Sequence, residues 1–177
     1  MDLIVSHDGT RWHAAFGAQT WRCAIGRSGV TRNKAEGDGA TPVGRFPLRR
    51  VLYRADRVPA PDTALPTAEI DPDDGWCDDP EDAAYNRAVR LPYPARHERM
   101  WRGDGLYDVV VVMGHNDDPP QPGLGSAIFL HVAWPDYGPT EGCVALAKPD
   151  LLTFLRTADS TAHVRVEDLS PLSFGGK

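Results

Sequence analysis

Residues 128–146 read IFLHVAWPDYGPTEGCVAL: an apolar run, a loop of turn-forming residues, and a second apolar run. We expect strands over residues 126–133 and 142–147, because short apolar runs bounded by turn signals are typical of buried strands. His131 in the first strand and Cys143 in the second are twelve positions apart. Antiparallel neighbours lie about 5 Å apart, so a strand, a return loop and a second strand would bring the two residues together.

A histidine beside a cysteine is the arrangement that a thiolate nucleophile needs. The imidazole of His131 would take the thiol proton and lower the pKa of Cys143 from about 8.5. Gly142 permits a sharp turn and a close substrate carbonyl, and the amides of Gly142 and Cys143 would face a developing oxyanion. The alternative is a structural thiol beside a core histidine. A third group should hold the imidazole, and the candidates are Asp136, Tyr137 and the backbone carbonyl of Thr140.

The clearest strand is expected over residues 107–114, YDVVVVMG, whose four consecutive valines indicate burial on both faces. A helix beginning at Lys148 presents one apolar stripe to the sheet, and a short helix is expected around residues 95–102. The pattern predicts one domain over residues 1–170 and a flexible tail at residues 171–177. Further strands are expected over residues 2–6, 20–26, 45–53, 67–70 and 163–167.

The composition is that of a globular protein, with 41% hydrophobic and 25% charged residues. The 16 prolines and 17 glycines predict many turns and a β-rich fold. A formal charge of −6 without a basic cluster argues against nucleic-acid binding. We see no secretory signal and no membrane-spanning stretch, so the chain as written would be cytoplasmic. We expect a monomer.

The three cysteines have scattered positions with no CxxC pair, which argues against a structural zinc site. Cys23 lies inside an expected strand and is interpreted as a small buried hydrophobe. Cys77 is followed by acidic residues, which would raise its pKa and make it a poor nucleophile.

A second group of candidates lies upstream of the central stretch. His115 follows the buried strand and is a possible base in place of His131, a substrate contact together with Asn116, or an ordinary turn histidine. A long proline- and aspartate-rich region is typical of either functional or merely packed loops. The residues there that we expect in a substrate groove are Trp76, Tyr85 and Asn86.

The segment TEGCVAL at residues 140–146, downstream of a histidine on a strand, resembles the active-site motif of the L,D-transpeptidase catalytic domain (the YkuD or ErfK family). The Thr-Pro-x-Gly-x-Phe turn at residues 41–46 is similar to that family's early signature, and the two motifs occur in the same order. The segments Trp-Cys-Asp-Asp-Pro and Gly-His-Asn resemble a compact branch of the family. The resemblance implies a β-sandwich-like domain of largely antiparallel strands with one or two short helices.

The resemblance also implies an activity and a site. Cys143 would be the nucleophile and His131 the base, with the Gly142 and Cys143 amides as oxyanion hole and the Thr140 carbonyl orienting His131. The family uses no metal and no organic cofactor. Its acyl donor is a peptidoglycan stem peptide, cleaved at an L-to-D centre to give a thioester that an amine resolves. The resemblance also implies that the protein is located in the periplasm or cell envelope.

Three departures from the family pattern stand out. Ala145 replaces the arginine usually found two places after the cysteine, and Arg45 is a candidate to supply its carboxylate contact. Glu141 replaces a more frequent histidine and would put a negative charge near the thiolate. The interval between His131 and Cys143 is shorter than usual, so the loop that caps the site should be reduced.

We therefore expect a cysteine-dependent L,D-transpeptidase. The first alternative is the same acylation resolved by water, as in a peptidase or amidase. A second is a non-catalytic peptidoglycan-binding module, which Glu141 and Ala145 favour. A third is a zinc hydrolase that uses His115, His131 and Asp117.

Overall fold

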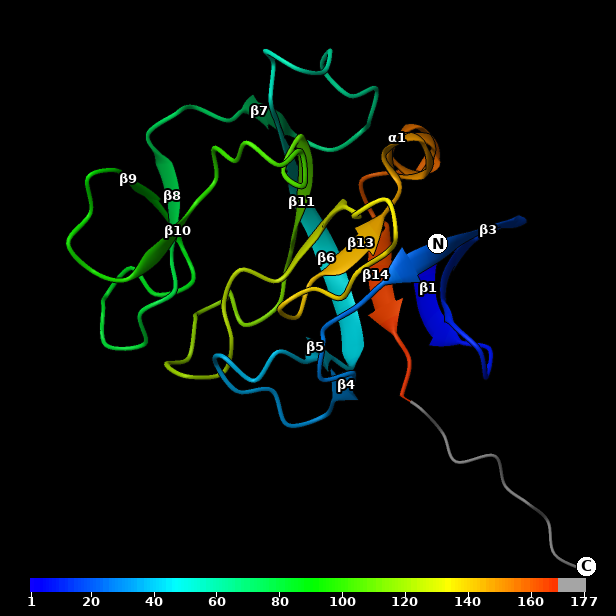
Figure 1. The fold of residues 1–177 in the computed structure, drawn as a ribbon, viewed down its shortest axis with the longest axis horizontal. Coiled ribbons are helices and arrows are strands. Elements are labelled where there is room, and N and C mark those ends of the chain that lie inside the picture. Colours follow the sequence, from blue (N-terminus) through cyan, green and yellow to red (C-terminus); the bar gives the residue numbers. More distant parts are fainter. Residues whose placement is uncertain (169–177) are drawn as a thin grey trace, which may run out of the picture.

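The computed structural model describes residues 1–168, so the predicted tail at residues 171–177 lies outside the described part. Strands dominate, and a single helix, α1 (Lys148–Thr157), occurs among the described residues (Figure 1). Within the same residues, no helix has the length and apolar character needed to cross a membrane. The strands in chain order are β1 (Asp2–His7), β2 (Trp12–Phe16), β3 (Gln19–Ala24), β4 (Val30–Thr31), β5 (Thr41–Pro42), β6 (Gly44–Tyr53), β7 (Thr67–Glu69), β8 (Asp74–Cys77), β9 (Ala88–Arg90), β10 (His97–Arg99), β11 (Val109–Met113), β12 (Phe129–Val132), β13 (Val144–Leu146) and β14 (His163–Val166).

The main sheet has nine strands in the order β11-β12-β13-β3-β2-β1-β14-β6-β7, and it closes because β11 also pairs with β6. The predicted mostly-β class is confirmed, and the main sheet forms a closed, barrel-like sheet rather than an explicit sandwich. The long strand β6 explains the closure. Its first part, from Gly44 to Pro47, pairs with β14, and its second part, from Leu48 to Tyr53, pairs with β11 across an irregularity in register.

The strands β11, β12 and β13 are buried along their whole length. Val109 and Val111 belong to the large core cluster enclosed by the closed sheet, whereas Val110 and Val112 belong to a second cluster on the other face. The prediction that the four valines are covered on both sides is confirmed. Apolar contacts on both faces suit β-branched side chains, which pack well on a pleated surface.

A small sheet with the strand order β10-β8-β9 packs on the second cluster, on the outer face of the main sheet. Figure 1 shows these three strands together, apart from the ring of the main sheet. Trp76 of β8 packs edge-on against Phe129 of β12, with ring centroids 5.0 Å apart. The predicted helix around residues 95–102 is wrong, because this segment contains β10, which takes its backbone partners from β8. Strand pairing here overrides a weak local helical preference.

The predicted antiparallel pairing of the two strands around the central loop is also wrong. β12 and β13 are parallel, with His131 opposite Ala145. The connecting loop must therefore run back along the sheet, and it is held to the segment after β3. There the Thr140 amide donates to the Ile25 carbonyl and the Arg27 amide donates to the Thr140 carbonyl. β13 then pairs antiparallel with β3.

The predicted helix after Lys148 is confirmed as α1. Its apolar stripe buries Leu151, Phe154 and Leu155 against the large core cluster. The Phe154 ring meets the Phe16 ring of β2 edge-on at 5.1 Å. The helix therefore seals the core at one end of the closed sheet (Figure 1).

We predict that Phe154→Ala lowers the free energy of unfolding by about 3–5 kcal/mol, because it removes a buried ring and leaves a cavity. Urea-induced unfolding followed by circular dichroism measures this loss. Arg156→Ala, on the exposed side of the same helix, is the matched control and should change stability by less than about 0.5 kcal/mol. Equal losses in the two variants would contradict the assignment of the core face.

Candidate active site

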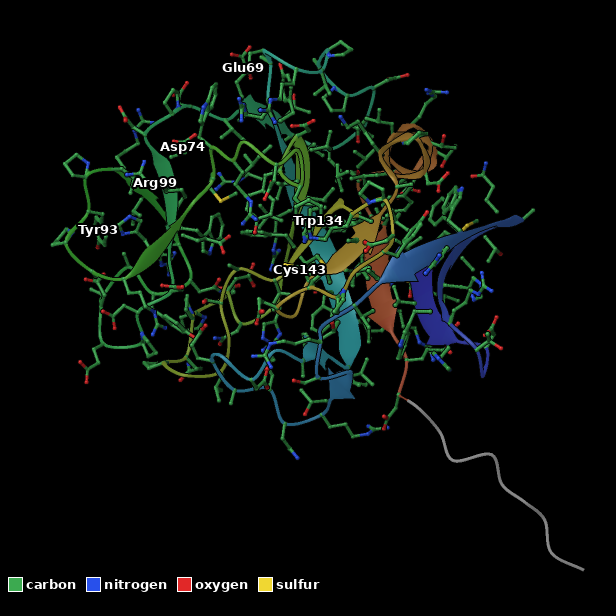
Figure 2. The ribbon with its side chains drawn as sticks, viewed as in Figure 1. Glu69, Asp74, Tyr93, Arg99, Trp134 and Cys143 are labelled. Carbon is green, nitrogen blue, oxygen red and sulfur yellow. The ribbon has the colours of Figure 1, made fainter. Side chains whose placement is uncertain are left out.

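Cys143 and His131 line one cavity of about 510 Å³ on the outer face of β12 and β13. Their alignment follows from the parallel register. His131 lies opposite Ala145, and side chains two positions apart share a face of a strand, so Cys143 falls on the same face as His131. Figure 2 shows Cys143 near the middle of the molecule, with Trp134 close by in that view, and Trp134 also lines the cavity.

The thiol of Cys143 is held by the backbone at the start of β12. Its Sγ donates to the Ala127 carbonyl at 3.2 Å and accepts the Phe129 amide at 3.3 Å. The Cys143 carbonyl accepts the Thr140 hydroxyl at 2.7 Å and the buried Thr41 hydroxyl at 3.5 Å. The two motifs that resemble the L,D-transpeptidase family, at residues 41–46 and 140–146, thus meet at this residue.

His131 is oriented by its own strand. Its Nδ1 donates to the Val132 carbonyl at 2.8 Å, which fixes the neutral tautomer with an unprotonated Nε2. The predicted orientation by the Thr140 carbonyl is wrong, because the imidazole N–H donates to the Val132 carbonyl and the Thr140 carbonyl accepts the Arg27 amide. Asp136 and Tyr137 do not hold the imidazole either. The Asp136 carboxylate accepts the Gly138 amide, and the Tyr137 ring lies under the Arg22 guanidinium.

No hydrogen bond joins Cys143 to His131 within residues 1–168. Burial raises the pKa of the Cys143 thiol to about 12, with a further contribution from the nearby Glu98 carboxylate. Burial lowers the pKa of His131 to about 4. The prediction that the imidazole lowers the thiol pKa is therefore wrong for this structure. Desolvation disfavours the charged form of each group, so a neutral thiol and a neutral imidazole face the same cavity.

Gly142 has a positive φ of 134°, and a Cβ at this position would lie 2.9 Å from the Ala40 carbonyl oxygen. The chain turns here as predicted, in a conformation that favours glycine. The Gly142 amide already donates to the Thr140 hydroxyl at 3.1 Å. It is therefore not free for an oxyanion, and Cys143 carries the remaining candidate amide.

None of the six residues predicted to contact substrate lines this cavity, so their contact with substrate stays a prediction. Asn86 holds the neighbouring loop instead. Its Nδ2 donates to the His115 and Asn116 carbonyls, and its Oδ1 accepts the Trp76 indole N–H and the Ala127 amide. Because the Ala127 carbonyl also accepts the Cys143 thiol, Asn86 helps to position that thiol. The six residues are Arg45, Trp76, Tyr85, Asn86, His115 and Asn116.

The rest of this group also has structural partners. His115 points at the Leu124 carbonyl and packs edge-on against Phe46, so it is not positioned to serve as the base. The Asn116 amide donates to two backbone carbonyls of the following loop. The Tyr85 hydroxyl donates to Glu36. Arg45 forms a bidentate ion pair with Asp2, so it cannot stand in for the missing arginine.

The ligand set of the zinc alternative is also not assembled. Asp117 is ion-paired with Arg49, and His115 does not line the cavity of His131. In the described part of the chain, no group of three His, Cys, Asp or Glu side chains is placed to hold a metal ion.

Two departures from the family motif can be located. Ala145 is buried in the cavity wall beside His131. Glu141 is exposed and ion-paired with Arg27 at 2.9 Å. The charge that disfavours the thiolate is therefore that of Glu98, not that of Glu141 as expected.

One wall of the cavity, formed by Glu98 and Tyr107, was not predicted from the sequence. Glu98 of β10 accepts the Tyr107 hydroxyl at 2.8 Å, and the Tyr107 ring meets the His131 ring edge-on at 5.4 Å. Burial raises the pKa of Glu98 to about 7, although the bond from Tyr107 acts in the opposite direction. No spacing rule links Glu98 to Cys143, because only the pairing of β10 with β8 brings it to the cavity.

The other two cysteines lie elsewhere. Burial raises the pKa of Cys23 to about 12, in agreement with a structural role. Burial and the nearby carboxylates of Asp82, Asp78 and Asp79 raise the pKa of Cys77, as predicted, and Cys77 does not line the cavity.

We predict that Glu98→Gln is more stable than the wild type by roughly 2 kcal/mol at pH 8, after allowance for partial exposure of the carboxylate. The raised pKa means that ionising Glu98 costs more in the folded than in the unfolded chain. This cost develops between pH 4.5 and about 7 and is absent below pH 4.5. The two proteins should therefore be equally stable near pH 4.

Thermal unfolding at both pH values measures this difference. Glu69→Gln, on the exposed strand β7 far from the labelled Cys143 in Figure 2, is the matched control. A stability gain of the same size in the control, or at pH 4, would contradict the assignment.

One family model matches the chain, that of the YkuD L,D-transpeptidase catalytic domain, over residues 6–166. No curated protein and no solved structure matches the chain significantly. The match includes both sequence motifs, at residues 41–46 and 140–146, and all the residues that line the cavity of Cys143. Because it spans nearly the whole chain, the chain belongs to the YkuD family of L,D-transpeptidase catalytic domains.

Proposed function

We propose that this protein is a cysteine-dependent L,D-transpeptidase that cleaves peptidoglycan stem peptides through a thioester on Cys143. The observation that carries the proposal is the placement of the Cys143 thiol and the His131 imidazole on one face of two parallel strands, at the wall of a cavity large enough for a peptide. A fixed tautomer of His131 leaves Nε2 as the acceptor for a proton. We further propose that residues 1–170 act as one domain and as a monomer.

The first half-reaction begins with the thiol leaving its hydrogen bond to the Ala127 carbonyl. Rotation about the Cα–Cβ bond, or one bridging water, passes its proton to Nε2 of His131. The thiolate attacks the donor carbonyl, the Cys143 amide stabilises the oxyanion, and His131 returns the proton to the departing amine. The products are a thioester and a free amine. An acceptor amine then attacks the thioester, an amide bond forms, and the thiol is released.

The Cys143 thiol and the His131 imidazole are both neutral at the start of the first half-reaction. Both groups are buried, so charge separation between them is costly. A bound peptide that supplies hydrogen bonds to the developing ions lowers this cost. Thiol reactivity should therefore depend on occupancy of the cavity.

We predict that incubation with a carbapenem or with a stem tetrapeptide adds one acyl mass to the protein. The adduct should be lost in Cys143→Ala and retained in Cys77→Ala, because only the first thiol lines the cavity. Intact-mass spectrometry measures both outcomes. A wild-type protein that binds the peptide without forming an adduct would instead identify a non-catalytic peptidoglycan-binding module.

We predict that the acyl-enzyme is resolved by an amine in preference to water. With a stem tetrapeptide as donor, adding a D-amino acid should convert the product from a hydrolysed tripeptide to an exchanged tetrapeptide. Liquid chromatography with mass detection separates the two products. Formation of tripeptide alone, whatever amine is added, would assign the protein as a hydrolytic L,D-peptidase of the same fold.

A further inference from the structure

The charged residues that line the cavity differ in whether they have an ionic partner. All three cationic residues of the lining are paired with a carboxylate. Among the acidic residues of the lining, Asp78 is paired with Arg96 and Glu141 with Arg27. The three cation pairs are Lys34 with Asp38, Arg96 with Asp78, and Arg102 with Asp104.

Two carboxylates of the lining have only hydroxyl partners among residues 1–168. Glu36 accepts the hydroxyls of Tyr85 and Ser126, both on the same oxygen. Glu98 accepts the Tyr107 hydroxyl on Oε1. Of these two, Glu98 is the one whose charge acts on the Cys143 thiol. Among residues 1–168, Glu98 is thus a carboxylate with no salt bridge that lies close enough to influence the Cys143 thiol.

This arrangement disfavours the resting thiolate, yet it suits a later stage of the reaction. Once Cys143 is acylated, its sulfur carries no charge for Glu98 to oppose. The acceptor amine of a stem peptide has a pKa of about 10, as a lysine side chain does. It therefore arrives as an ammonium ion. It must lose a proton before it can attack. His131 is a weak base for this step, because burial lowers its pKa to about 4.

The geometry points to Glu98 as the acceptor-site base, which binds the ammonium group of the incoming amine beside the Cys143 thioester and removes its proton. This inference rests on the proposed transpeptidase function. In the step itself, one N–H proton passes to a carboxylate oxygen of Glu98 and the freed lone pair attacks the thioester carbonyl. The C–N bond forms and the C–S bond breaks. The second N–H proton of the amine passes to the departing thiolate, and the first leaves Glu98 for solvent.

Several charged groups face Glu98 and set its charge state. The Tyr107 hydroxyl and the Arg102 guanidinium favour the carboxylate, whereas Asp78 and Glu36 disfavour it. The first two come from the segment before β11, Asp78 follows β8, and Glu36 lies in the loop before β5. With these neighbours and with partial burial, Glu98 can exchange a proton near neutral pH.

A purely structural role for Glu98 is the competing explanation, since it anchors Tyr107, which packs on His131. Glu98→Gln separates the two roles. The glutamine still accepts the Tyr107 hydroxyl through its carbonyl oxygen, but it neither pairs with an ammonium ion nor takes its proton. Glu69→Gln makes the same chemical change on an exposed strand and is the matched control.

The experiment measures the two half-reactions separately. Acylation is followed by intact mass with the stem tetrapeptide as donor, and transfer is followed with two acceptors, D-lysine and hydroxylamine. Hydroxylamine is largely unprotonated at pH 7 and needs no base. We expect Glu98→Gln to acylate at least as fast as wild type and to lose about 100-fold in transfer to D-lysine. Transfer to hydroxylamine should remain within a few fold of wild type.

The pH dependence gives an independent readout. In the wild type, transfer to D-lysine should rise with pH and level off above about pH 7, once Glu98 is ionised. In Glu98→Gln it should instead keep rising above pH 7, in step with the fraction of free amine. Glu69→Gln should match wild type throughout. Unchanged transfer to D-lysine in Glu98→Gln, or equal losses with both acceptors, would overturn the inference. A wild type that forms no acyl-enzyme would overturn the proposed function itself, which is a distinct outcome.

Discussion

The parallel ladder between β12 and β13 is the constraint on which the site depends. It sets His131 opposite Ala145 and so brings Cys143 onto the face of His131, where both line one cavity. A parallel pair requires the chain to cross back between its strands, and the crossing loop carries the turn that presents the thiol. That turn is fixed from two sides, by Thr140 within the loop and by Thr41 from the early motif. A shift of one residue in this register would send the thiol to the opposite face.

The chemistry of the site is governed by desolvation. The small sheet β10-β8-β9 and its aromatic contacts cover the outer face of β12, which buries the imidazole and the thiol and keeps both neutral. If Cys143 is the nucleophile, as we propose, a bound substrate would have to replace water with directed hydrogen bonds before the thiol could react. The same cover delivers Glu98 to the cavity. The small sheet β10-β8-β9 therefore both shields the Cys143 thiol from solvent and places Glu98 in the cavity.

Some parts of the site could be read from the sequence and others could not. The alternation of β12 and the Gly-Cys turn identified His131, Gly142 and Cys143, because these depend on local period and backbone freedom. The partner of His131 is a carbonyl one residue away, which any sequence would offer, so no motif marks it. Trp76 and Asn86 were expected to contact substrate, and in the structure the Asn86 amide oxygen accepts both the Trp76 indole N–H and the Ala127 amide. No local pattern in the sequence indicates these bonds, because they join residues that are distant along the chain.

The sequence by itself determined the strand-rich class, the doubly buried β11, the helix α1 and the family to which the chain belongs, because periodicity, turn residues and short motifs are local properties. Only the tertiary structure decided the parallel direction of β13, the closure of the sheet through β6, the strand at β10 and the arrival of Glu98 beside the thiol. Each of these features depends on hydrogen bonds between backbone groups that are distant along the chain and on how far packing removes water from charged groups. Neither property can be read from the order of neighbouring residues.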